Sequence, residues 1–207
     1  MQKLITLIGC AFLWAGLVVA AEPLKGSVLD GQKKSEICAS CHMVDGNSKV
    51  GMYPKISGQA EAYMVKQLTE FRKGEQGNRS NPVMAAIVQA YTDQDIADLA
   101  AYFASQTVTI GEADPELVAL GEKIFKGGNS KTGLPACAAC HNIQGLGNKA
   151  ANIPRLSGQL AEYVAIELHR YQKDQRKTDL NGMMRDIAKL MTEQEINAVS
   201  SYVSGLH

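Results

Sequence analysis

The chain has 207 residues, which is enough for one ordinary domain or two small ones. Its 21 lysine and arginine residues equal its 21 aspartate and glutamate residues in number, so no excess of basic charge points to nucleic acid as a partner. Only four histidines and five cysteines are present, so few side chains can serve as imidazole or thiol ligands.

The first 21 residues are predicted to be a secretory signal peptide. Lys3 supplies a positive charge, residues 4–20 are apolar, and the small residues 19–21 resemble a cleavage site. An uncleaved membrane anchor is the alternative, although the apolar run is slightly short for a span. A lipoprotein acylation site at Cys10 is disfavoured because apolar sequence continues beyond that cysteine. We expect cleavage near Ala21, which leaves four cysteines in the mature chain.

A helix predicted over residues 28–40 leads into the first of two copies of a five-residue motif, Cys38-Ala39-Ser40-Cys41-His42 and Cys137-Ala138-Ala139-Cys140-His141. The spacing Cys-x-x-Cys-His is typical of c-type haem attachment. In a helix, cysteines three apart share one face, where both sulfurs can bond the vinyl groups of one porphyrin. The next histidine then lies beneath the ring. We therefore predict two covalent haem c groups, with Cys38, Cys41, Cys137 and Cys140 as anchors and His42 and His141 as proximal iron ligands.

Two other uses of paired cysteines fit less well. A structural zinc site has its second cysteine pair roughly 15–20 residues after the first, whereas most of a small domain separates Cys41 from Cys137. A thioredoxin-like redox pair needs a βαβ context, and neither motif lies in an alternating, β-branched strand pattern.

The remaining predicted elements are also helices. One is expected over residues 58–73, with apolar and aromatic residues such as Tyr63 on a core face and Gly74 at its end. The pairs Thr92/Asp95 and Thr192/Glu195 resemble capping boxes that open a last helix in each half. Residues 127–135 are extra in the second half and are predicted to form a surface loop.

A shift of 100 positions superposes one half of the sequence on the other. Residues 54–59 then match residues 154–159, and residues 92–96 match residues 192–196. This pattern predicts a duplicated domain. The expected organisation is a signal peptide over 1–21, an N-terminal domain over 22–105, a linker over 106–115 and a C-terminal domain over 116–207.

Each iron also needs a ligand on its other side. Bis-histidine ligation of both irons lacks ligands, because His169 has no counterpart in the first half and His207 is the last residue. Met84 and Met184 are the two methionines that correspond across the repeat, and each begins the pattern Met-x-x-Ile. We predict them as distal ligands, with Met183 left open as a competitor for Met184.

Two further predictions concern the surroundings of the iron. Histidine/methionine ligation raises the reduction potential and leaves no iron position for small molecules, which indicates a carrier. Each proximal histidine is expected to give its other ring N–H to a backbone carbonyl, with Pro54 and Pro154 as the candidates. Met64 and Met191 are expected to fill the core.

The duplicated Cys-x-x-Cys-His, Pro-x-Ile/Leu-x-Gly-Gln and Met-x-x-Ile motifs resemble the dihaem cytochrome c4 family over essentially all of residues 22–207. The resemblance implies an all-α fold of two tandem class I cytochrome c domains, related by pseudo-two-fold symmetry, with haem propionates facing each other near the interface. It also implies a periplasmic monomer, soluble or loosely attached to the inner membrane. Such a protein accepts electrons from a respiratory donor complex and passes them to a terminal oxidase.

Two alternatives belong to other functional classes. The haem subunit of a flavocytochrome-type dehydrogenase resembles this dihaem architecture and would copurify with a flavoprotein. A dihaem peroxidase needs one haem with an open or displaceable sixth position, against which the two matched methionines argue. We expect an electron carrier without substrate turnover of its own.

Overall fold

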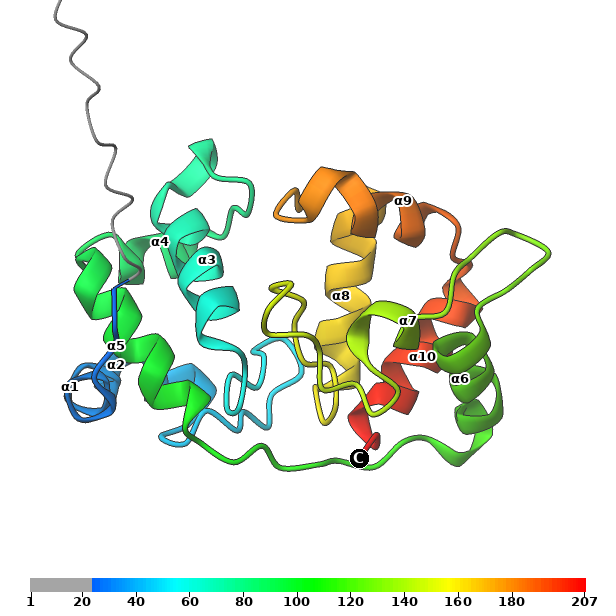
Figure 1. Ribbon diagram of the computed structural model, residues 1–207, viewed down its shortest axis with the longest axis horizontal. Coiled ribbons are helices and arrows are strands. Elements are labelled where there is room, and N and C mark those ends of the chain that lie inside the picture. Colours follow the sequence, from blue (N-terminus) through cyan, green and yellow to red (C-terminus); the bar gives the residue numbers. More distant parts are fainter. Residues whose placement is uncertain (1–23) are drawn as a thin grey trace, which may run out of the picture.

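The computed structural model describes residues 24–207, and the predicted signal peptide over 1–21 lies outside that range. The described residues are helical, with isolated β-bridges but no β-strand. It forms two groups of helices that lie side by side (Figure 1). The N-terminal half contains α1 (Val28–Lys34), α2 (Glu36–His42), α3 (Glu61–Arg72), η1 (Gly74–Gln76), α4 (Pro82–Val88) and α5 (Asp93–Ala104). The C-terminal half contains α6 (Pro115–Gly127), α7 (Ala138–His141), α8 (Ala161–Gln172), η2 (Leu180–Gly182), α9 (Met183–Lys189) and α10 (Glu193–Ser204).

The predicted helix over 28–40 is in fact two helices that meet at Ser35. Its hydroxyl donates to the carbonyl of Gln32 at 2.8 Å, and its backbone N–H bonds the same carbonyl, which closes α1. The second helix, α2, then continues through His42. The first Cys-x-x-Cys-His motif is therefore helical, as its predicted chemistry requires.

The other local predictions agree closely with the structure. The helix predicted over 58–73 is α3, which spans Glu61–Arg72, and Gly74 follows it with a φ of +60°. Both capping boxes are present, with the Thr92 and Thr192 side chains at the N-termini of α5 and α10. Met64 and Met191 are buried, as expected for core residues.

Glycines allow the first and last helices of each half to pack closely. A Cβ on Gly31 would lie 2.0 Å from the carbonyl oxygen of Asp98, and a Cβ on Gly121 would lie 2.3 Å from that of Ala198. Both distances are far inside van der Waals contact, so α1 crosses α5, and α6 crosses α10, only because no side chain is present at these positions.

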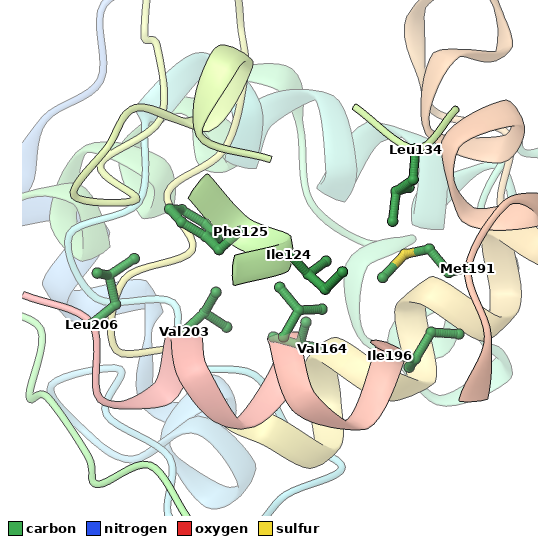
Figure 2. Close-up of a cluster of buried hydrophobic side chains, with 9 residues drawn as sticks. Ile124, Phe125, Leu134, Val164, Met191, Ile196, Val203 and Leu206 are labelled. Atoms are coloured by element: carbon green, nitrogen blue, oxygen red, sulfur yellow. The ribbon is translucent and has the colours of Figure 1, made fainter. Parts of the chain in front are cut away.

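Apolar side chains from α6, α8 and α10 form the core of the C-terminal half (Figure 2). Ile124 and Phe125 of α6 lie against Val203 of α10 and Val164 of α8. The N-terminal half has a smaller equivalent cluster, which includes Met64, Leu99 and Phe103. Partly buried apolar residues extend both clusters toward the motif cysteines Cys38 and Cys137.

The extra segment 127–135 is only partly a surface loop. Asn129 and Leu134 exchange two backbone hydrogen bonds of 2.8 and 3.1 Å, which close a tight turn. The Leu134 side chain is buried in the C-terminal core, and the Asn129 amide donates to Glu195 at 2.7 Å. The prediction of a surface loop is correct for the turn itself and wrong for Leu134, which anchors the loop to the domain.

The segment between α5 and α6 has no helix, and it is held by both halves. The Asn47 side chain donates to Thr107 O at 2.9 Å and accepts from Thr109 N at 2.8 Å. Gly111 N donates to Ser204 O in α10 at 2.9 Å. In Figure 1 this segment runs along the bottom of the molecule from one half to the other. No helix in residues 24–207 has the length and apolar composition that crossing a membrane requires.

We predict that Gly121→Ala destabilises the folded protein by about 1–3 kcal/mol, because the new methyl group forces α6 away from α10. Gly127→Ala is the matched control, since a Cβ there meets no atom within 4 Å. The control should leave stability unchanged or raise it by up to about 1 kcal/mol. Denaturant unfolding of the two variants measures the difference, and equal effects would contradict the close packing.

Candidate haem sites

The first motif places two thiols and an imidazole along α2. Cys38 and Cys41 are free cysteines, three residues apart, and His42 is buried with 7% of its surface exposed. The His42 Nδ1 atom lies 2.9 Å from the carbonyl oxygen of Pro54. Because a carbonyl only accepts, Nδ1 carries the proton and donates it, which leaves the Nε2 lone pair free for a metal.

The second motif repeats this geometry at α7, which follows α6 and the loop over 127–135 in the C-terminal half. His141 is also 7% exposed, and its Nδ1 atom lies 2.9 Å from the carbonyl oxygen of Pro154. Burial lowers the pKa of His42 and of His141, which favours the neutral imidazole that ligates metals. The structure thus brings each predicted proximal histidine together with its predicted proline.

The cysteines do not have the surroundings of reactive thiolates. Burial raises the pKa of Cys38 and of Cys137 to about 11, so these thiols are protonated at neutral pH. Cys41 is partly buried, as Cys38 is, whereas Cys140 is exposed. Within residues 24–207, no group of three or more His, Cys, Asp or Glu side chains could hold a metal ion directly. The two motifs therefore do not converge on one zinc site in the described chain.

The predicted distal methionines lie on two short, equivalent helices. Met84 is in α4 and Met184 is in α9, and both are half-buried. The preceding residues, Val83 and Met183, are 62% and 45% exposed. Met183 thus occupies the position that Val83 occupies in the first half, and both side chains are exposed. The pattern of burial favours Met184 over Met183.

The residues present fit a covalently bound haem in each half. Each site offers two thiols, a neutral histidine with a free Nε2 atom and a half-buried thioether, which is the donor set of a c-type haem. Half-buried apolar side chains such as Ile56 and Leu156 pack against the same core clusters as the motif cysteines Cys38 and Cys137. These surfaces suit a porphyrin face.

A buried charge cluster, which no pattern in the sequence indicates, lies between the halves. Arg176 donates to the Tyr63 hydroxyl of the other half at 2.6 Å, and Arg79 donates in the same way to Tyr163. The expectation that Tyr63 is simply a core residue is therefore wrong, because its hydroxyl accepts a hydrogen bond across the interface. Arg79 and Arg176 do not align with each other at the repeat shift of 100. The repeat therefore gave no indication that each arginine bonds a tyrosine of the other half.

The cluster holds two buried guanidinium groups and one carboxylate, Glu167, which the half-buried Arg170 also contacts at 2.6 Å. Glu167 lies 3.3 Å from Arg79 and 2.6 Å from Arg176, whereas the equivalent residue of the first half is the neutral Gln67. Burial alone would raise the pKa of Glu167, but the guanidinium groups of Arg79, Arg176 and Arg170 outweigh it and lower that pKa to about 2. Among the described residues, the buried Arg79 Nε atom has no hydrogen-bond partner. An additional carboxylate would balance the excess positive charge and could accept a hydrogen bond from Arg79 Nε. Haem carries two carboxylates.

Comparison with known proteins gives a consistent result. A family model described as Cytochrome c matches residues 28–107 and again residues 118–207. The chain is 40% identical over 208 residues to cytochrome c4 of Pseudomonas aeruginosa, with all of both chains covered. It is 43% identical to cytochrome c4 of Azotobacter vinelandii over 189 residues, which cover 88% of this chain and 90% of that protein.

A solved structure is similar as well. The crystal structure of reduced recombinant cytochrome c4 from Pseudomonas stutzeri superposes with a TM-score of 0.85 at 41% sequence identity. The match covers 88% of this chain and 100% of that one. The similarity therefore extends over both halves and their arrangement.

The Glu167 carboxylate should make stability depend on pH in the acid range. Its pKa in the folded chain, about 2, lies below its ordinary value of 4.5, so the unfolded chain binds more protons between these values. Stability from this group is present above pH 4.5 and is lost as the pH falls toward 2. We predict that Glu167→Gln removes this part of the slope and destabilises the protein at neutral pH by about 3–5 kcal/mol, because two buried cations lose their counter-charge.

Denaturant unfolding at several pH values tests this prediction. Glu122→Gln is the control, since Glu122 pairs with Lys126 on the surface and both side chains are well exposed. Such a pair contributes about 0–1 kcal/mol. The same pH profile for the wild type and Glu167→Gln would contradict the proposed role of the carboxylate.

Proposed function

The chain belongs to the cytochrome c family and, within it, to the cytochrome c4 proteins, and on that premise we propose that it is a periplasmic electron carrier of a respiratory chain. It is a dihaem electron-transfer cytochrome with two covalently bound haem c groups. The observation that carries the proposal is the repeated donor set, in which each half holds a neutral histidine against a proline carbonyl at 2.9 Å. Two sites with the same donor set suit two one-electron steps.

We propose the following site residues. Cys38, Cys41, Cys137 and Cys140 form the thioether links, His42 and Met84 ligate one iron, and His141 and Met184 ligate the other. The haem iron, when bound, exchanges one electron with a partner. His/Met ligation raises its potential and leaves no position for a substrate. The carbonyls of Pro54 and Pro154 fix the tautomer and the orientation of the histidines.

The proposed partners are a respiratory donor complex and a terminal oxidase, and the proposed location is the periplasm. Export is supported by the predicted signal peptide over 1–21. Exposed apolar residues next to the first motif, Ile37, Met43 and Val44, and next to the second, Ile143, provide contact area for transient partners. We propose a monomer that is soluble or loosely attached to the inner membrane, with domains over 22–105 and 116–207 joined by the segment 106–115.

The choice between adjacent methionines predicts a clear difference between two variants. Met184→Ala should lose about half of the weak long-wavelength absorption band that a methionine–Fe(III) bond produces, because one of two such bonds is removed. Met183→Ala is the matched control and should retain the full band. The absorption spectrum of each oxidised variant makes the measurement. A band halved by Met183→Ala and preserved by Met184→Ala would assign Met183 as the ligand.

The carrier function predicts that the protein delivers electrons to an oxidase without a permanently bound flavoprotein. We expect the protein to purify without a flavoprotein, and its reduced form to be reoxidised by respiratory membranes at a rate that falls when the oxidase is inhibited. Copurification with a flavoprotein would favour the subunit of a dehydrogenase. Rapid turnover of peroxide by the purified protein would favour a peroxidase.

A further inference from the structure

Two buried glutamines exchange hydrogen bonds across the domain interface. The Gln159 side chain accepts from the backbone N–H of Lys55 at 2.9 Å and donates to the Lys55 carbonyl at 2.8 Å. In the opposite direction, Gln59 accepts from the N–H of Arg155 at 2.9 Å and donates to its carbonyl at 3.1 Å. Both glutamines are only 9% exposed, so the bonds are shielded from water.

One of the two bonds that each glutamine makes ends on the peptide unit that holds a proximal histidine. The peptide between Pro54 and Lys55 accepts from His42 Nδ1 through its carbonyl and donates to Gln159 through its N–H. The peptide between Pro154 and Arg155 joins His141 to Gln59 in the same way. A single peptide therefore links the histidine of one half to a side chain of the other half.

The glutamines are also fixed at their own end. The Gln59 Oε1 atom accepts a further bond from Ala60 N at 3.0 Å, and the Gln159 Oε1 atom accepts one from Leu160 N at 2.9 Å. These donors directly precede α3 and α8, so each glutamine is held by the start of a helix that belongs to its own half. The amide groups cannot shift without breaking several bonds at once.

We propose that Gln59 and Gln159 are positioning residues that adjust the proximal histidine of the opposite half. Gln159 acts on His42 and Gln59 acts on His141, in each case through one peptide unit. The proposal rests on the proposed ligation of iron by these histidines. It makes the reduction potential of each haem depend on a residue of the other domain, so that the docking of the two halves takes part in setting both potentials.

Hydrogen-bond cooperativity determines the direction of the effect. An N–H that donates to a buried acceptor polarises its peptide, and the carbonyl at the other end becomes a stronger acceptor. A stronger acceptor draws the Nδ1 proton and makes the imidazole a more basic ligand. A more basic ligand favours Fe(III), so each glutamine lowers the potential of the opposite haem, and its removal should raise it.

The test uses Gln159→Leu and Gln59→Leu in the full-length, haem-loaded protein. The potential of each haem is followed by redox titration, with haem methyl NMR signals assigned to each half. Gln159→Leu should raise the potential of the haem on His42 and leave that on His141 unchanged, and Gln59→Leu should do the reverse. We expect the equilibrium constant for reduction to change about threefold, which is about 28 mV for one electron.

Amide hydrogen exchange provides a second measurement that does not depend on haem ligation. Lys55 N–H should exchange about tenfold faster in Gln159→Leu, and Arg155 N–H about tenfold faster in Gln59→Leu, because each loses its acceptor. In the wild type both amides should exchange slowly, which can be checked even where a variant fails to fold. Gln94→Leu is the matched control, since Gln94 also donates to a backbone carbonyl, that of Lys25, but within one half. It should change neither potential and neither amide.

The outcomes separate this proposal from the proposed function. A shift confined to the haem of the mutated half, equal shifts of both haems, or unchanged potentials would overturn the positioning role. Rapid exchange of both amides in the wild type would also overturn it. Loss of the methionine–Fe(III) band in the wild type would instead overturn the proposed ligation, whatever the glutamine variants show.

Discussion

The peptide unit that follows Pro54, and its counterpart after Pro154, is the constraint on which both haem sites depend. Its carbonyl accepts the Nδ1 proton of the proximal histidine, which fixes the tautomer and turns Nε2 toward the metal side. Its N–H donates to a glutamine of the opposite half. The same few atoms thus orient the proposed iron ligand and join two domains, so the interface and the two sites form one hydrogen-bonded structure.

The two halves share this arrangement but differ in charge. Tyr63 and Tyr163 are bonded reciprocally by Arg176 and Arg79, yet only the C-terminal half contributes a carboxylate, Glu167. Duplication therefore gives two sites with the same donor set in unequal electrostatic surroundings. Under the proposed ligation, such a difference allows the two irons to have different potentials, since burial and nearby charge act on each iron separately.

The sequence predicted what short-range patterns determine. The motif spacing, the capping boxes at Thr92 and Thr192, and the all-α duplicated fold follow from residues a few positions apart or from direct repetition. The sequence pattern did not indicate the break at Ser35, because a single side-chain hydrogen bond, from the Ser35 hydroxyl to the carbonyl of Gln32, closes α1 there. The pairing of Arg79 with Tyr163 was missed because it joins residues distant in sequence that the repeat does not align. The iron ligands and the domain bounds remain predictions, supported by burial and by the His–Pro bonds.

The most direct test of the account is the absorption spectrum of the purified, oxidised wild-type protein, combined with its haem-to-protein ratio. We predict two haems per chain and a methionine–Fe(III) band of the strength expected for two bonds, unchanged after addition of peroxide or cyanide. A ratio below two, a band of half that strength, or its loss on adding either compound would contradict the account. Such a result would mean that at least one iron has an open or displaceable position.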